Sequence, residues 1–228
     1  MATFIRNRWQ ALPGMGGSFG PEYATDDRWM SKSGYGMIMC YLSDDNGKSW
    51  HRSKTVLDGV FLKDHLQYDV MLQEPGVVEL NDGRLMMFCR SDAGYLVLSW
   101  SEDCDESWTP CRMSNIVSPL SPASIERIPN SDTLLMVWNN HSGVDTSLTG
   151  KRTPLFMAVS GDDGQTWEEE RVLENNPNGW YCYTAIHFAR SHVLLGYCAG
   201  DRRENNGLAE TRVVRIPLKW LYSHATAD

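Results

Sequence analysis

The sequence lacks the features that mark membrane, secreted and nucleic-acid-binding proteins. No stretch approaches the ~18 consecutive apolar residues that a membrane-spanning helix needs. The first 17 residues, MATFIRNRWQALPGMGG, lack the continuous apolar core of a signal peptide, so we expect an intracellular protein or a chain without its natural N-terminus. Positive charge is not in excess either. The 21 Lys and Arg residues against 29 Asp and Glu give a net charge of −8, which argues against nucleic acid and membrane surfaces as partners.

Two further absences narrow the fold class. The six cysteines show no Cys-x-x-Cys spacing, which disfavours zinc and thioredoxin-like sites and leaves buried free thiols as the interpretation. No segment shows apolar residues at the 3.6-residue period of a helix. Short apolar runs recur instead between turn-forming clusters, which predicts an all-β protein. The clearest runs cover residues 36–42, 76–80, 84–90, 95–100, 133–138, 155–160 and 193–198.

One turn sequence occurs three times. Ser43–Trp50 reads SDDNGKSW, Ser101–Trp108 reads SEDCDESW, and Ser160–Trp167 reads SGDDGQTW. The shared pattern is Ser-x-Asp-x-Gly-x-Ser/Thr-Trp, with Asp105 in place of the glycine in the second copy. The copies begin 58 and 59 residues apart, and a near-constant period of this size is typical of a repeat architecture.

We expect the repeated turn to be a structural device. Its central aspartate accepts hydrogen bonds from backbone N–H groups inside the turn. Gly47 and Gly164 supply a positive φ without steric cost. The closing tryptophan packs its apolar face against the neighbouring repeat unit. The aspartates are Asp45, Asp103 and Asp162, and the tryptophans are Trp50, Trp108 and Trp167.

The period predicts the blades of a β-propeller. Short strands with one Trp-bearing turn per repeat favour four-stranded blades, because a sandwich or barrel would not explain the periodic turn. The 228 residues hold about four such units and no linker, so we expect a single domain over residues 1–228. The polar, glycine-rich segment up to Gly34 makes the first unit incomplete. Because an open arc would expose edge strands, we expect missing N-terminal blades or a partner chain to complete the propeller.

A second region combines a hairpin with two charged residues. The letters NDG at residues 81–83, between two apolar runs, are a strong hairpin signal with the glycine in the left-handed region. Pairing Leu80 with Arg84 then places Glu74 opposite Arg90 at the open end of the hairpin. Taken alone, this arrangement fits a cross-strand surface ion pair as well as a functional site.

These motifs resemble those of a known family. The repeated turn is similar to the Asp-box, or BNR repeat, of sialidases, and the stretch from Gln73 to Trp167 resembles a sialidase catalytic domain. The resemblance covers most of the chain, from about Tyr35 onward. It implies a sialidase-like β-propeller, six-bladed in the family, of which this chain holds about four blades. It also implies that Glu74 is catalytic and that Arg90 binds a substrate carboxylate.

The resemblance extends to two later segments. Arg152 precedes the apolar run that leads into the third Asp-box, and it matches a second arginine of the carboxylate-binding triad of sialidases. Residues 178–186, NGWYCYTAI, look like the segment that carries the tyrosine nucleophile. We favour Tyr181 and keep Tyr183 as the alternative, since strand alternation puts both side chains on one face and does not distinguish them.

The implied chemistry accounts for these residue types. Sialic acid carries a carboxylate on its anomeric carbon, and an arginine fork binds that group bidentately. A carboxylate nucleophile would be repelled by this charge, whereas tyrosine is neutral until it attacks. A phenol needs a base, which is the role we assign to Glu74. The expected partner is a sialylated glycan or another anionic sugar, with no metal and no other cofactor.

Two parts of the family's site have no clear counterpart. Sialidases carry a first arginine in an Arg-Ile-Pro motif on their first blade, whereas the tripeptides at Arg127 and Arg215 lie elsewhere, and we read both as chance matches. The general-acid aspartate lies on an early loop in the family. Asp26, Asp27 and Asp64 are candidates by residue type only.

The sequence therefore predicts an exo-sialidase-like glycoside hydrolase with a retaining mechanism. Three alternatives stay open: a glycan-binding propeller without catalysis, a glycosidase of other sugar specificity on the same scaffold, and a partial propeller without independent activity. Trp138, Asn139 and Asn140, at the end of another predicted strand, are either core residues or sugar contacts.

Overall fold

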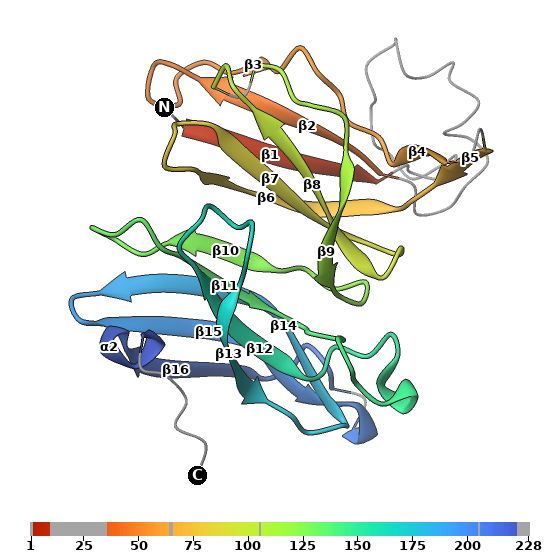
Figure 1. Ribbon diagram of the computed structural model, residues 1–228, viewed down its shortest axis with the longest axis vertical. Helices are drawn as coiled ribbons and strands as arrows, with labels where there is room; N and C mark the ends of the chain where they lie inside the picture. Colours follow the sequence, from red (N-terminus) through yellow and green to blue (C-terminus); the bar gives the residue numbers. More distant parts are fainter. Residues whose placement is uncertain (1, 10–35, 64–65, 105, 205, 223–228) are drawn as a thin grey trace.

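The computed structural model describes residues 2–9, 36–63, 66–104, 106–204 and 206–222 of the chain. Within these residues the regular secondary structure is almost entirely antiparallel β-sheet, which confirms the predicted fold class (Figure 1). The described helical elements are short: η2 (Thr146–Leu148), η3 (Arg202–Glu204) and α2 (Leu218–Leu221). None of these helices is long and apolar enough to cross a membrane.

The strands form four sheets and one separate hairpin. The first sheet holds β1 (Ala2–Trp9), β2 (Gly36–Ser43) and β3 (His51–Arg52), and the hairpin holds β4 (Val60–Lys63) and β5 (Leu66–Asp69). The second sheet holds β6 (Leu72–Glu79), β7 (Leu85–Ser91), β8 (Tyr95–Ser101) and β9 (Arg112–Val117). The third holds β10 (Ser124–Arg127), β11 (Leu134–Trp138), β12 (Leu155–Ser160) and β13 (Glu168–Glu174), and the fourth holds β14 (Gly179–Ala189), β15 (His192–Asp201) and β16 (Thr211–Pro217).

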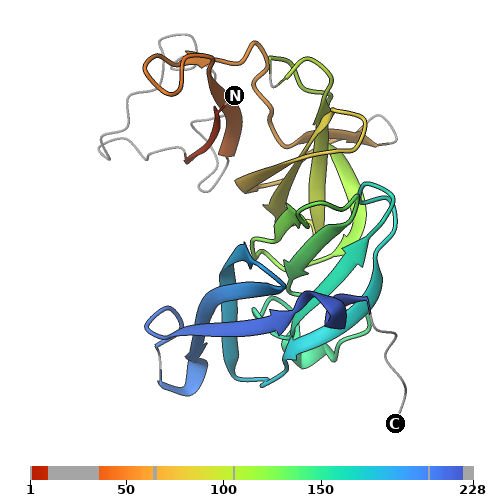
Figure 2. The ribbon, with the colours of Figure 1, turned by 90° about the vertical axis from the view of Figure 1, so that its left-hand side faces the viewer.

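The four sheets follow one another as blades of a propeller. Within each sheet the strand order follows the chain order, so each blade is an antiparallel meander. The blades are arranged in an arc that does not close into a ring (Figure 2). This arrangement matches the predicted propeller architecture with about four blades.

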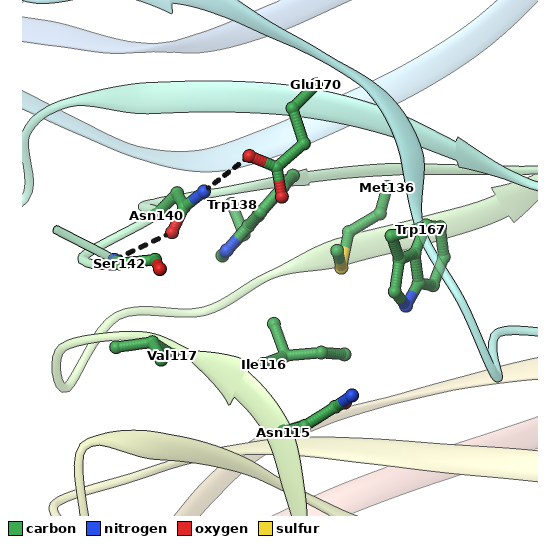
Figure 3. A pocket seen from close by; sticks show the side chains of 9 residues that line it. All are labelled: Asn115, Ile116, Val117, Met136, Trp138, Asn140, Ser142, Trp167 and Glu170. Carbon is green, nitrogen blue, oxygen red and sulfur yellow. Dashed lines mark hydrogen bonds between the residues drawn. The ribbon is translucent and has the colours of Figure 1, made fainter.

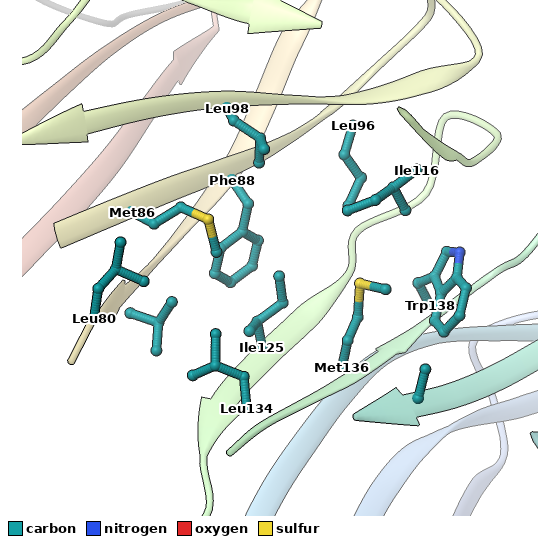
Figure 4. Close-up of a cluster of buried hydrophobic side chains, with 12 residues drawn as sticks. Leu80, Met86, Phe88, Leu96, Leu98, Ile116, Ile125, Leu134, Met136 and Trp138 are labelled. Carbon is teal, nitrogen blue, oxygen red and sulfur yellow. The ribbon is translucent and has the colours of Figure 1, made fainter. Parts of the chain in front are cut away.

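Buried side chains hold neighbouring blades face to face. Between the second and third blades lies a cluster that includes Met86, Leu96, Leu134 and Met136, each at most 2% exposed (Figure 4). Similar clusters join the first blade to the second and the third to the fourth. Full burial of one such side chain is worth about 1.5–3 kcal/mol, so contacts between sheets provide much of the stability of each blade.

A polar contact also links the second and third blades. The Arg127 guanidinium donates to the backbone oxygen of Glu79 at 2.8 Å and pairs with Asp163 at 3.0 Å. The backbone N–H of Asn81 donates to the same Asp163 carboxylate at 3.1 Å. Arg127 therefore has a structural role between blades, which agrees with the reading of its tripeptide as a chance match.

The hairpin at residues 81–83 forms as predicted, with one local difference in register. The N–H of Leu80 donates to the oxygen of Arg84 at 2.8 Å, and Gly83 has a φ of 84°. The expected pairing holds from Glu79 back to Gly76 and then shifts, so that the Cα partner of Arg90 is Gln73. The prediction that Glu74 lies directly opposite Arg90 was wrong by one residue, because a β-bulge inserts an extra residue in β6.

The repeated turns use the predicted hydrogen bonds. In each copy the aspartate carboxylate accepts from the hydroxyl of the first serine, at 2.9 Å for Asp45, 3.0 Å for Asp103 and 2.8 Å for Asp162. It also accepts from the N–H and the hydroxyl of the Ser or Thr four residues later. Gly47 and Gly164 have φ values of 83° and 82°, as expected.

These hydrogen bonds affect the acidity of the turn aspartates. They lower the pKa of Asp45 to about 2, with the Ser49 hydroxyl as the largest cause. The pKa values of Asp103 and Asp162 are lowered in the same way by Ser107 and Thr166. The carboxylate form is therefore part of each turn.

The turn tryptophans behave in two ways. Trp108 is 7% exposed within the cluster between the first two blades, and Trp167 packs against the cluster between the second and third. Trp50 is 46% exposed, so the prediction that it packs against a neighbouring unit was wrong. Its indole turns back on its own loop, where Nε1 donates to the oxygen of Gly47 at 3.1 Å.

Candidate active site

The first strands of the second and fourth blades, β6 and β14, each carry a β-bulge. The register shifts between Gln73 and Gly76 in β6, and between Cys182 and Ala185 in β14. In each bulge one non-glycine residue has a positive φ: Glu74 at 48° and Tyr183 at 56°. Such a conformation costs on the order of 1–3 kcal/mol and persists only where surrounding contacts impose it. Bulges redirect side chains, and here they turn two polar side chains toward each other.

The side chains from the two bulges are in direct contact. The Tyr183 hydroxyl donates to Glu74 Oε1 at 3.1 Å across a sequence separation of 109 residues. The other carboxylate oxygen of Glu74 lies 3.0 Å from Nη1 of Arg90. A phenol, a carboxylate and a guanidinium therefore form a continuous line at one edge of the blades.

Arg90 is held rigidly within this line. Its side chain is 7% exposed, and its Nε donates to Oε1 of the fully buried Gln73 at 2.9 Å. Nη2 donates to the same amide oxygen. A buried guanidinium needs both charge pairing and hydrogen bonds, and Glu74 and Gln73 supply them.

A second cationic group lies on the other side of Tyr183. Arg152, which precedes β12, has its guanidinium carbon 5.2 Å from the centre of the Tyr183 ring and 5.3 Å from that of Trp180. Arg202, in η3, lies 4.3 Å from the Trp180 ring. Burial and the like charge of Arg152 lower the pKa of Arg202. In the described part of the chain neither arginine forms an ion pair with a carboxylate, so this edge of the site has unbalanced positive charge.

The two candidate tyrosines have different environments. Tyr183 is 44% exposed beside Glu74, whereas Tyr181 is 4% exposed in the core between the third and fourth blades. Tyr181 packs edge-on against Tyr197 at 6.5 Å, and burial together with the nearby Glu174 carboxylate raises the pKa of Tyr181. The expectation that both tyrosines share one face was wrong, because the bulge after Cys182 breaks the alternation.

A hollow of about 380 Å³ lies beside this contact, between β6, β10 and β14. Its lining includes Glu74 from β6, Glu126 from β10 and Thr184 from β14. The Ser124 hydroxyl donates to the oxygen of Thr184, which fixes β10 against β14 at this point. The first strands of three blades therefore meet beside the contact between Glu74 and Tyr183.

Some of the predicted site residues cannot be placed. Asp26, Asp27 and Asp64, the candidates for the general acid, lie outside the described residues. Within the described part, no group of three or more His, Cys, Asp or Glu side chains is arranged to hold a metal ion. Arg215 lies on β16, at the outer edge of the fourth sheet.

Sequence reasoning missed three residues of this region. Gln73, Trp180 and Arg202 each contact one of the predicted residues. Gln73 and Trp180 are direct sequence neighbours of Glu74 and Tyr181, which is a usable signal. Arg202 is the residue directly after β15. Only the contact of its guanidinium with the Trp180 ring shows that it belongs to this region.

The fold and the repeated turns define a β-propeller of the Asp-box type. The chain belongs to the BNR repeat-like domain family, which matches residues 2–195. The predicted resemblance to sialidases is thereby confirmed at the level of family and fold.

Known proteins similar to the chain include sialidases and trans-sialidases. A sialidase from Micromonospora viridifaciens is 26% identical over 176 residues, which cover 73% of this chain and 25% of the relative. The NanB sialidase of Streptococcus pneumoniae has a similar fold, with a TM-score of 0.60 and 19% identity over 82% of this chain and 28% of that one. The intramolecular trans-sialidase of Ruminococcus gnavus follows, with a TM-score of 0.56 and 19% identity over 84% of this chain and 40% of that one. The chain thus spans about a quarter of the length of the curated relative.

Proposed function

We propose that the chain carries an exo-sialidase-like glycoside hydrolase site that removes terminal sialic acid from glycoconjugates with retention of configuration. The observation that carries this proposal is the hydrogen bond from Tyr183 to Glu74, formed between two strained bulges on different blades. Strained non-glycine backbone in contact across a fold is concentrated at functional sites. The sialidases among the similar proteins supply the substrate class.

In this proposal Tyr183 is the nucleophile and Glu74 its base. The Tyr183 oxygen attacks the anomeric carbon while its proton passes to Glu74 Oε1, 3.1 Å away. The bond to the leaving oxygen breaks, and a proton donor supplies that oxygen with a proton. Water then cleaves the sialyl–tyrosine bond, and the phenol recovers a proton. Tyr183 is preferred over Tyr181 because Tyr181 is buried and its pKa is raised.

The arginines would recognise the carboxylate of the sugar. Arg152 lies beside the Tyr183 ring with no carboxylate partner among the described residues, so it is available to an anionic substrate. Arg90 already pairs with Glu74 and is almost fully buried, so it also orients the base. A planar guanidinium fork matches a carboxylate in geometry as well as in charge.

The test is release of 4-methylumbelliferone from its sialic acid glycoside by the 228-residue chain, with Tyr183→Phe and Tyr181→Phe as a matched pair. We expect Tyr183→Phe to reduce turnover by about 10³-fold or more and Tyr181→Phe to change it by less than about tenfold. Far-UV circular dichroism and a thermal melt show whether each variant is folded. The reverse ranking, with both variants folded, would reject Tyr183 as the nucleophile.

The same assay separates the alternatives. A folded chain that binds sialosides without turnover, and keeps that binding in Tyr183→Phe, is a glycan-binding propeller. Cleavage of a neutral or uronic acid glycoside instead of a sialoside indicates a different sugar specificity. A chain that melts without cooperativity and releases no product is a partial propeller without independent activity.

A further inference from the structure

A second, smaller cleft lies between the second and third blades, away from Glu74 and Tyr183. It has a volume of about 160 Å³ and is bordered by the end of β9 on one side and by β11 and β13 on the other (Figure 3). Ile116, Val117 and Met136 form its apolar wall. It shares no lining residue with the hollow beside Glu74.

Two hydrogen-bond donors in this cleft have no partner within the described part of the chain. They are the indole Nε1 atoms of Trp138 and Trp167, and both atoms are buried. Trp138 is only 3% exposed as a whole. Figure 3 shows both indole nitrogens on the side of the rings that faces β9 and the cleft. Because a buried donor without a partner is costly, these two N–H groups point to an acceptor bound in the cleft.

The Glu170 carboxylate lines the same cleft as a hydrogen-bond acceptor, held in place by Asn140. Asn140 is fixed, since its Nδ2 donates to Glu170 Oε2 at 3.1 Å and its Oδ1 accepts from the N–H of Ser142 at 2.8 Å. The second carboxylate oxygen of Glu170 turns toward Trp138 (Figure 3). The Ser142 side chain adds a hydroxyl at the rim. Two donors and an anionic acceptor therefore line one small space, all three on its third-blade side.

We propose that this cleft is a binding subsite for one neutral pyranose ring. An anion would be repelled by Glu170, and a cation cannot accept hydrogen bonds from the two indole N–H groups. A hydroxyl accepts from an indole N–H and donates to a carboxylate at the same time, so neighbouring ring hydroxyls satisfy both the donors and the acceptor. The apolar wall takes the C–H face of the sugar ring. The subsite does not depend on the catalytic roles of Glu74 and Tyr183.

Heteronuclear NMR of the ¹⁵N-labelled chain tests this subsite directly. The probes are methyl β-D-galactopyranoside and methyl α-D-glucopyranoside, with the methyl glycoside of sialic acid as the anionic comparison. We expect the Nε1–H resonances of Trp138 and Trp167, identified by single Trp→Phe substitutions, to shift saturably with at least one neutral probe. The exposed Trp50 indole, which is bonded within its own turn, serves as the internal control and should not shift.

Two variants examine the proposed hydrogen bonds. Glu170→Gln keeps the shape of the side chain but removes its charge, and we expect it to weaken binding of the neutral sugar about fivefold or more. Glu168→Gln, on the same strand but outside the lining, should leave affinity unchanged. Absence of any saturable shift with both neutral probes would overturn the proposal. So would a shift caused by the sialoside alone, or equal binding by Glu170→Gln and the unchanged chain.

Discussion

The two edges of the blades use the same unusual backbone conformation for different purposes. At one edge the Asp-box turns hold Asn46, Cys104 and Asp163 at positive φ, within loops that an aspartate stabilises by local hydrogen bonds. At the other edge Glu74 and Tyr183 have positive φ in bulged strands, and their side chains meet across 109 residues of sequence. The first arrangement stabilises a turn, and the second brings two polar side chains into contact.

The third blade shows that a bulge in the first strand of a blade is not a general requirement of the fold. Its strand β10 pairs with β11 without any register shift over Ser124–Arg127. β10 lies between the bulged strands and completes the hollow, yet it carries no strained residue. Among the three strands that line the hollow, only the two that supply Glu74 and Tyr183 therefore contain a non-glycine residue at positive φ. Elsewhere in the third blade, Glu169 in β13 has such a φ, beside a register shift in the pairing of β12 with β13.

This comparison predicts that turnover and stability can be altered separately. The largest effect is expected for Glu74→Gln, which keeps the size of the side chain but removes the base. Turnover of the sialic acid glycoside should fall by about 10²–10⁴-fold. The matched control is Glu79→Gln, an exposed residue at the other end of β6, which should retain turnover. Equal activity of the two variants would contradict a catalytic role for the bulge.

Arg152→Lys should have a smaller effect at the same edge. Lysine keeps the positive charge but loses the planar fork, so kcat/KM should fall about 10–100-fold, mainly through a higher KM. Arg84→Lys, on the exposed hairpin beside Asp82, is the control and should be neutral. A fall in kcat at unchanged KM would argue against carboxylate binding by Arg152.

At the opposite edge, Asp162→Asn should reduce stability and spare turnover. The substitution weakens the bonds from Ser160 and Thr166, and we expect a loss of about 1 kcal/mol in the free energy of unfolding, because the turn is partly exposed. Asp132→Asn, on an exposed turn without such bonds in the described structure, should change this free energy by less than about 0.5 kcal/mol. Urea unfolding measures both. A stable but inactive Asp162→Asn protein would break the distinction between the two edges.

The smallest expected effect is a pH dependence of the unfolding free energy that the Asp-box aspartates cause. Asp45 has its pKa lowered from 3.8 to about 2 by the Ser49 hydroxyl, and the pKa values of Asp103 and Asp162 are lowered too. A carboxyl group with a lowered folded-state pKa stabilises the fold above its unfolded-state pKa, and this contribution is lost as the pH falls. Unfolding free energies should therefore decrease between about pH 4 and pH 2. The decrease should be shallower in Asp45→Asn, and an unchanged slope would show that the turn contributes nothing.

Much of the fold could be predicted because its signals are local. The Asp-box turns depend on hydrogen bonds within eight residues, so their letters reveal them directly. The hairpin at residues 81–83 sets the register of β6 and β7, and it brought Glu74 within one position of its true place beside Arg90. The exposure of Trp50 was less predictable. It depends on whether a neighbouring sheet covers the turn, which the letters of the turn do not reveal.

The sequence alone determined the blade repeat, the turn chemistry and the pairing of a carboxylate with a guanidinium at the open end of a hairpin. Each of these follows from steric preferences and hydrogen bonds among residues close together in the chain. Only the tertiary structure gave Tyr181 a buried and Tyr183 an exposed environment, because the bulge after Cys182 is a property of the packed sheet. It alone also brought Tyr183 to Glu74, and Trp138 to Trp167 in one cleft, since such contacts depend on how the blades pack and not on the order of the letters.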